Sequence, residues 1–177
     1  MAKSKIIFRS LLFLFCIVCS SFQNPSITNL RSVYLSQVGQ MEHPLGSNWG
    51  YPVKKYLASV HDYQPDPWCA AFVHFCLDSA GYKTNITAAA SSGDNLKHRV
   101  YFKTKLYEPI QYGDVFTIFF PSMGRIGHTG FVDQKVNDGI YSTVEGNTNN
   151  NGSREGIGVF KRKRSLHTLY SVSRWTN

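Results

Sequence analysis

The sequence predicts a single α+β domain in which helices come first and a largely antiparallel sheet follows. Helical spacing of apolar residues is confined to the first half of the chain, whereas short strand-like segments fill the second half. Aromatic residues make up 14% and charged residues 17% of the 177 residues, a composition that favours a strand-rich or mixed fold over a helical bundle. An apolar content of 42% excludes a disordered chain, and no repeat or Gly/Ser linker divides it.

Two helices are predicted before residue 61, because apolar residues recur there at helical spacing. The first covers Leu30 to Val38, and the second covers Val53 to Val60 with Pro52 at its start. From residue 113 onward the pattern becomes strand-like, and turn residues separate most of the segments. The predicted strands cover residues 114–120, 128–136, 140–145, 158–162 and 166–174.

The clearest helix is predicted over residues 66–81. Asp66 suits its N-cap, Pro67 its first helical position and Gly81 its C-cap. This places Cys69 in the first turn, where free amide N–H groups and the positive end of the helix dipole stabilise a thiolate. Two interpretations follow for Cys69. It is either a nucleophile whose own N–H can bind an oxyanion, or a small buried hydrophobe on the apolar stripe of the helix.

The first 21 residues are predicted to be a secretory signal peptide. Lys3, Lys5 and Arg9 form a basic start, the nine residues from Leu11 to Cys19 are apolar, and serines follow. Nine helical residues span about 14 Å, which is too short for a hydrocarbon core of about 30 Å. We therefore expect cleavage near residue 22 and a secreted or periplasmic protein with no stable membrane insertion. An uncleaved anchor and a lipid anchor on Cys19 are the alternatives.

Removal of this segment changes the charge and the cysteine count. The net charge falls from +8 to +5 with the loss of three basic residues, and only Cys69 and Cys76 remain. On one helix their Cα atoms lie about 10 Å apart, beyond the limit of about 7 Å for a disulfide. We therefore expect two free thiols, with Cys76 buried in the middle of the helix.

A cysteine nucleophile needs a base and a group that orients the base. Of the six histidines, His74 points away from Cys69 around the helix, whereas His128 opens a strand between two glycines. Glu145 ends the next predicted strand and Asn147 lies two residues further on. In a hairpin either side chain could accept the imidazole N–H. The residues alone leave two alternatives open, because His128 can be an ordinary strand residue and the Glu-Gly-Asn segment an ordinary turn.

Taken in order, these motifs resemble the CHAP family, the cysteine, histidine-dependent amidohydrolases/peptidases of the NlpC-type, papain-like superfamily. The resemblance runs from about Gly39 to Trp175 and implies a papain-like fold, with the nucleophile at a helix start packed on a C-terminal antiparallel sheet. It also implies cleavage of amide bonds in bacterial cell-wall peptidoglycan. The matching runs are WCAAFV at 68–73, GDVF at 113–116, GHTGFV at 127–132 and VEGN at 144–147.

Position by position, the resemblance implies a role for each candidate residue. Cys69 matches the nucleophile, His128 the base and Glu145 the third member of a triad, while Asn147 matches a polar helper. The implied reaction is acyl transfer through a thioester, and it requires no metal or other cofactor. No separate oxyanion donor is matched, and Gln64 is a weak candidate for that role.

The resemblance therefore implies one catalytic domain over residues 22–177, acting as an N-acetylmuramoyl-L-alanine amidase or a stem-peptide or cross-bridge endopeptidase. A non-catalytic or regulated wall-binding module on the same fold and a thiol acyltransferase or lipid hydrolase are the alternatives. The basic run at 161–164 could form a nucleic-acid or membrane patch, but alternation along a strand favours a solvated sheet edge. We expect a monomer whose partner is the anionic wall polymer peptidoglycan, with no nucleic acid bound.

Overall fold

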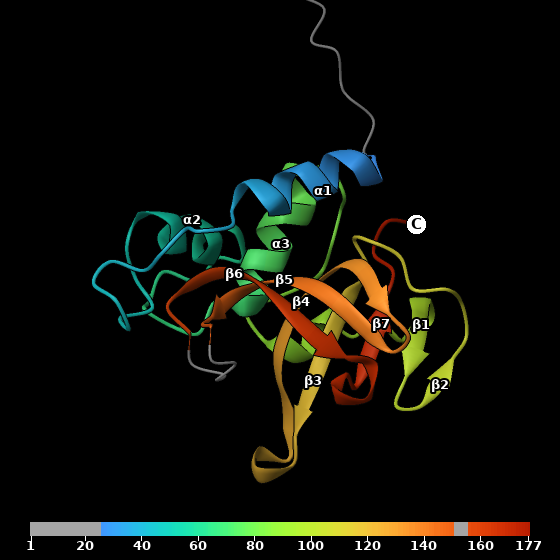
Figure 1. Ribbon diagram of the computed structural model, residues 1–177. Helices are drawn as coiled ribbons and strands as arrows, with labels where there is room; N and C mark the ends of the chain where they lie inside the picture. The colour runs from blue at the N-terminus through green and yellow to red at the C-terminus, as the bar shows by residue number, and fades with distance from the viewer. Residues whose placement is uncertain (1–25, 151–155) are drawn as a thin grey trace, which may run out of the picture.

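The computed structural model describes residues 26–150 and 156–177, which form three α-helices packed on a seven-stranded sheet (Figure 1). The helices are α1 (Ile27–Ser36), α2 (Tyr51–Ser59) and α3 (Cys69–Ser79). The strands are β1 (Arg99–Phe102), β2 (Lys105–Leu106), β3 (Val115–Phe120), β4 (Arg125–Asn137), β5 (Ile140–Thr148), β6 (Gly158–Ser165) and β7 (Ser171–Ser173). Short 3-10 helices cover Ala90–Gly93, Leu96–His98, Pro121–Met123 and Leu166–Thr168. The predicted α+β order is confirmed, and the predicted signal peptide lies outside the described residues.

Within the described part of the chain, the strands follow the order β2-β1-β7-β3-β4-β5-β6, and every pair is antiparallel. The consecutive strands β3 to β6 are neighbours, whereas β7 returns to lie between β1 and β3. The predicted antiparallel sheet is therefore confirmed. Two features differ from the prediction: β1 and β2 are short strands that we did not predict, and the predicted strand 166–174 is a 3-10 turn followed by the short strand β7.

Two apolar clusters lie on opposite faces of the sheet. The first fills the space between the helices and the sheet and includes Leu30, Phe72 and Phe131. The second lies on the other face and includes Phe116 and Val132. The neighbours Phe131 and Val132 belong to different clusters, because successive side chains of a strand point to opposite faces. No helix within residues 26–150 and 156–177 has both the length and the apolar character needed to cross a bilayer.

Helix α3 begins three residues after the predicted N-cap. Trp68 occupies the cap position, and the first helical hydrogen bond runs from the amide of Phe72 to the carbonyl of Trp68 at 2.9 Å. The Asp66 amide instead bonds the carbonyl of Gln64 at 2.9 Å, so the backbone turns before the helix can start. Cys69 is consequently the first helical residue, and its amide precedes the first helical hydrogen bond.

The remaining helix predictions are confirmed with shifted ends, because both helices begin two or three residues earlier and stop one or two residues earlier than predicted. Helix α1 stops before Val38, and α2 has Pro52 in its first turn and stops before Val60. At the end of α3, Ala80 occupies the C-cap position and Gly81 follows with a φ of 88°. That left-handed conformation suits glycine and turns the chain away from the helix.

Candidate active site

Cys69 opens onto a cleft at the start of α3. The cleft has a volume of about 300 Å³, and its lining includes the Cys69 side chain, the carboxylates Asp62 and Asp66, and Arg125. Its other lining residues are small or apolar, among them three consecutive alanines. Cys69 itself is only 5% exposed. A thiol at this position combines access from the cleft with the free amides of a helix N-terminus.

His128 lies buried in β4, 2% exposed, with its ring 6.2 Å from that of Phe116 between centroids. Its Nε2 donates to the Glu145 carboxylate across 2.8 Å. The other ring nitrogen, Nδ1, is buried and makes no hydrogen bond of normal geometry among the described residues. Because Nε2 is occupied by Glu145, Nδ1 is the nitrogen available to the Cys69 thiol.

The protonated form of His128 is favoured by its two neighbours. Burial alone lowers the pKa of His128, but hydrogen bonding with Cys69 and Glu145, together with their negative charges, outweighs burial and raises the pKa to about 9. In the structure itself, Nδ1 forms no hydrogen bond of normal geometry among the described residues. At neutral pH the imidazolium predominates, and the ring carries the proton that a leaving amine needs.

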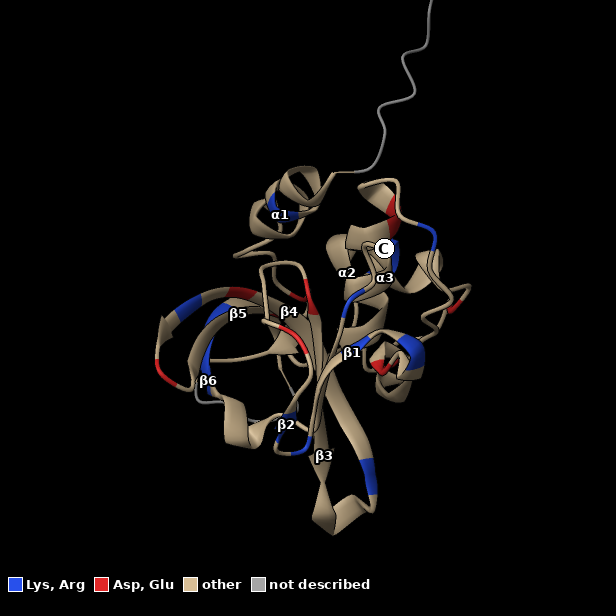
Figure 2. Cartoon of the chain, turned by 90° about the vertical axis from the view of Figure 1, so that its right-hand side faces the viewer, with Lys and Arg blue, Asp and Glu red and all other residues tan. Residues whose placement is uncertain are grey.

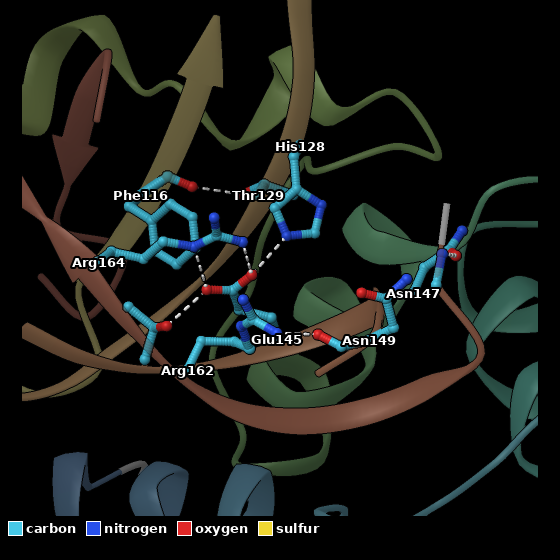
Figure 3. Close-up of polar contacts among 10 residues, drawn as sticks. Phe116, His128, Thr129, Glu145, Asn147, Asn149, Arg162 and Arg164 are labelled. Carbon is cyan, nitrogen blue, oxygen red and sulfur yellow. Dashed lines mark hydrogen bonds and ion pairs between the residues drawn. The ribbon is translucent and has the colours of Figure 1, made fainter. Parts of the chain in front are cut away.

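Glu145 lies in β5 and is fully buried. Besides His128, it accepts hydrogen bonds from the Thr143 hydroxyl at 2.5 Å and from Arg164 of β6 at 2.8 Å and 2.6 Å (Figure 3). Burial raises the pKa of Glu145, but the hydrogen bonds and positive charges of Arg164 and His128 outweigh burial and lower the pKa to about 2. The carboxylate is thus ionised over the whole neutral range.

Two glycines allow the strands and α3 to approach closely enough to form this site. At Gly130 of β4, an added Cβ would lie 3.1 Å from the Glu145 Cγ and 2.9 Å from a backbone carbonyl of β5. At Gly146, it would lie 2.6 Å from the Phe72 Cβ and 2.8 Å from the Trp68 ring. Because glycine has no side chain, Gly130 lets β4 pack closely against Glu145, and Gly146 lets β5 pack closely against α3.

Part of the chain matches a family of known proteins. Residues 61–147 match the family described as "CHAP domain". The chain contains a CHAP domain. Such domains belong to the papain-like, NlpC/P60-related group of cysteine/histidine amidohydrolases, and the fold class predicted from the sequence is confirmed. The matched residues include the start of α3, His128 and Glu145.

Two solved structures resemble this chain at low sequence identity. One is described as "The crystal structure of Ly7917", with 16% identity and a TM-score of 0.43 over 84% of this chain and 62% of that chain. The other is described as Ly7917 "with the hydrolyzing product of MDP", with 16% identity and a TM-score of 0.44 over 85% and 63%. The chain thus spans less than two thirds of these structures, and no curated protein matches its sequence.

Asn147 forms hydrogen bonds with residues other than His128. Its φ of 49° is left-handed, and the register of β5 and β6 shifts after Glu145, so the two-residue alternation of the strand breaks there. Its Nδ2 donates to the Asn48 side chain at 3.4 Å and its Oδ1 accepts from the Gly156 amide at 3.1 Å. Among the described residues it makes no hydrogen bond to His128, and its role as a polar helper stays a prediction.

The remaining candidates lie outside the cluster formed by Cys69, His128 and Glu145. The two described cysteines are both free, as predicted, and burial raises the pKa of Cys76 well above its usual value. The His74 ring is bonded to Ser59 at 3.2 Å, as expected for a residue that faces away from Cys69. Gln64 is exposed and is not part of the cleft lining.

The basic run on β6 contributes a residue that the sequence analysis missed. Strand β6 forms one edge of the sheet, beside β5 (Figure 2). Lys161 and Lys163 are exposed, whereas Arg162 and Arg164 are partly buried, so the predicted alternation is confirmed. The inward-facing Arg164 binds Glu145. The signal was present in the sequence, because alternation sends two arginines inward, and an inward cation requires a buried acid as its partner.

Proposed function

We propose that the protein is a cysteine-dependent amidohydrolase that cleaves amide bonds in bacterial peptidoglycan, with Cys69 as nucleophile, His128 as acid and base, and Glu145 as the orienting carboxylate. The observation that carries this proposal is the buried His128, bonded through Nε2 to an ionised carboxylate and influenced by Cys69 on the cleft side. The CHAP domain supports the substrate class at the level of the family.

The residues can carry out acyl transfer in two steps. The Cys69 thiolate attacks the amide carbonyl, and the free N–H groups of the first turn of α3 stabilise the oxyanion. The His128 imidazolium then gives its proton to the nitrogen of the leaving amine, which leaves a thioester. Neutral His128 next takes a proton from water, the hydroxide attacks the thioester, and the thiolate is restored as the acid product leaves. Glu145 holds the ring and stabilises its charged form throughout.

Two classes of bond fall within this proposal, the amide between the sugar and the peptide and the amides of the stem peptide or cross-bridge. Asp62 and Asp66 on the cleft together with Arg125 suit a ligand that carries both amine and carboxylate groups, as peptide ends do. A thiol acyltransferase would use the same residues with an acceptor other than water. Mass spectrometry of digested peptidoglycan identifies the bond and the acceptor, because water leaves a free carboxylate on the product.

A matched pair of cysteine variants tests the nucleophile. We expect Cys69→Ala to abolish release of muropeptides while its circular dichroism stays unchanged, and Cys76→Ala to retain most activity. Iodoacetamide at neutral pH should label Cys69 first, because the cleft exposes it and Cys76 is fully buried. Full activity in Cys69→Ala, or earlier labelling of Cys76, would falsify the assignment of the nucleophile. Binding of peptidoglycan without any release of muropeptides by the unaltered protein would favour a binding module.

The proposal includes export of the protein, with wall polymer as its partner. The predicted signal peptide gives an expected mature N-terminus near Phe22. Intact-mass measurement on protein from the exported fraction tests this expectation. A mass that retains Met1, or one that carries a diacylglycerol on Cys19, would replace the secreted protein with an anchored one.

A further inference from the structure

Arg164 saturates the carboxylate of Glu145. Its Nε donates to Oε1 at 2.8 Å and its Nη2 to Oε2 at 2.6 Å. Thr143 donates to Oε1 and His128 to Oε2, so within the described part of the chain the two oxygens accept four hydrogen bonds. A carboxylate has about four lone-pair sites. The orientation of Glu145 is therefore fixed at both oxygens, and Arg164 provides half of the bonds.

The contact between Arg164 and Glu145 is largely shielded from solvent. In the register of β5 and β6, Arg164 lies opposite Tyr141, whereas Glu145 lies opposite Phe160. The guanidinium therefore has to run along the strand to reach the carboxylate, and its side chain is only 16% exposed. A bidentate guanidinium fixes a carboxylate plane, which the single ammonium of lysine cannot do.

We propose that Arg164 is a positioning residue of the active site, which fixes the plane of Glu145 and limits how tightly Glu145 holds the proton of His128. This inference rests on the proposed function, because it assigns Arg164 a part in the same reaction. It goes beyond the Cys-His-Glu triad by adding a fourth charged member from the edge strand β6 (Figure 3).

The four charged groups form a buried row of alternating sign. Cys69 comes from α3, His128 from β4, Glu145 from β5 and Arg164 from β6, and in the reactive state their charges are negative, positive, negative and positive. These are the titratable and charged groups that act on the His128 and Glu145 pair. The hydroxyl of Thr143 and the ring of Phe116, which also lie against the pair, carry no charge.

Loss of Arg164 would leave this row with one excess negative charge. Each proton then binds more tightly, whichever member of the row receives it. We therefore expect Arg164→Met to move both limbs of the kcat/KM profile to higher pH. We also expect kcat to fall about 10- to 100-fold, the usual loss when a partner that orients a functional side chain is removed.

Further variants separate charge from geometry. Arg164→Lys keeps the positive charge but loses the bidentate guanidinium. Both limbs of the kcat/KM pH profile should therefore stay near their original pH, while kcat falls by less than in Arg164→Met. Arg164→Gln is neutral and keeps one donor, and it replaces the methionine variant if that variant does not fold. Lys163→Met is the matched control, because Lys163 is the exposed neighbour on the same strand, and its profile should not move.

The deciding measurement does not depend on turnover. In a Cys69→Ala background, NMR titration of the His128 ring should give a higher pKa with Met or Gln at position 164 than with Arg, and a nearly unchanged pKa with Lys. An unchanged titration in the neutral variants, together with lowered thermal stability, would make Arg164 a purely structural residue and overturn the inference. Residual hydrolysis by Cys69→Ala itself would instead contradict the proposed function, and the ring titration would still report on Arg164.

Discussion

Replacing Glu145 with glutamine preserves the size of the side chain and removes the charge that faces His128. The pKa of His128 is about 9 against its usual 6.5, a difference that corresponds to about 3.4 kcal/mol at 1.36 kcal/mol for each pKa unit. Both Cys69 and Glu145 raise the pKa of His128, whereas burial lowers it. One adjacent opposite charge typically changes a pKa by about 1–3 units. In the variant Arg164 also faces the ring without its partner. The alkaline limb of kcat/KM should therefore move from about 9 toward 7.

The rate should fall with the same change. A positioned acid–base group contributes about 10²- to 10⁴-fold to a rate, so we expect kcat of Glu145→Gln to drop within that range. Breaking a buried ion pair costs about 3–5 kcal/mol of stability, and because Arg164 is 16% exposed we expect the lower end. The double variant Glu145→Gln with Arg164→Met removes the unpaired cation, so it should recover stability without recovering activity.

The assay is a pH profile of peptidoglycan hydrolysis for the three proteins, with the melting temperature of each measured in the same buffers. A downward shift of the alkaline limb with recovered stability in the double variant supports the triad. An unshifted profile in Glu145→Gln with lowered stability would refute the reasoning, since Glu145 would then only shape the backbone before Gly146.

Three further predictions follow from the same contacts. The pKa of Glu145 is about 2 in the folded chain against its usual 4.5. Ionised Glu145 therefore stabilises the fold above pH 4.5, and this contribution is lost as the pH falls through 2. The pKa of His128 is raised from 6.5 to about 9, so protonated His128 stabilises the fold below pH 6.5, and this contribution is lost as the pH rises through 9. Melting temperature against pH should show both declines, and His128→Ala should remove the alkaline one. Gly146→Ala should lower the unfolding free energy by about 1–3 kcal/mol in a denaturant titration, because its Cβ meets Phe72; wild-type stability would contradict the close packing. Asn147→Ala should reduce kcat less than Glu145→Gln and leave both pH limbs in place, and a shifted limb would show that Asn147 acts on the imidazole.

Much of the fold and the core of the candidate site could be predicted because both depend on local patterns. Apolar periodicity placed α1, α2 and the strands from β3 to β6, and helix geometry alone excluded a disulfide between Cys69 and Cys76. His128 and Glu145 were predicted from ordered motifs, and a pair of adjacent strands joined by a short turn brings such residues together.

The remaining features depend on backbone details and long-range pairing that local patterns do not contain. Helix α3 begins after a local turn in which the Asp66 amide bonds the carbonyl of Gln64, and a capping pattern in the sequence does not specify such a turn. The direction of Asn147 depends on a left-handed φ, which overrides strand alternation. The contact of Arg164 with Glu145 depends on the register of two strands and on a side chain that runs along them, so residues far apart in the sequence must be aligned first.

The position of β7 determines when this domain can fold as the chain is synthesised. Strand β7 pairs with β1 on one side and with β3 on the other. Strands β1 and β3 therefore do not pair with each other directly. A growing chain that has reached residue 165 already contains Cys69, His128, Glu145 and Arg164, but the sheet beneath them is still in two pieces. Long-range strand pairing is slow and follows loop closure. The sheet therefore stays incomplete until residues 171–173 are available to pair with both strands.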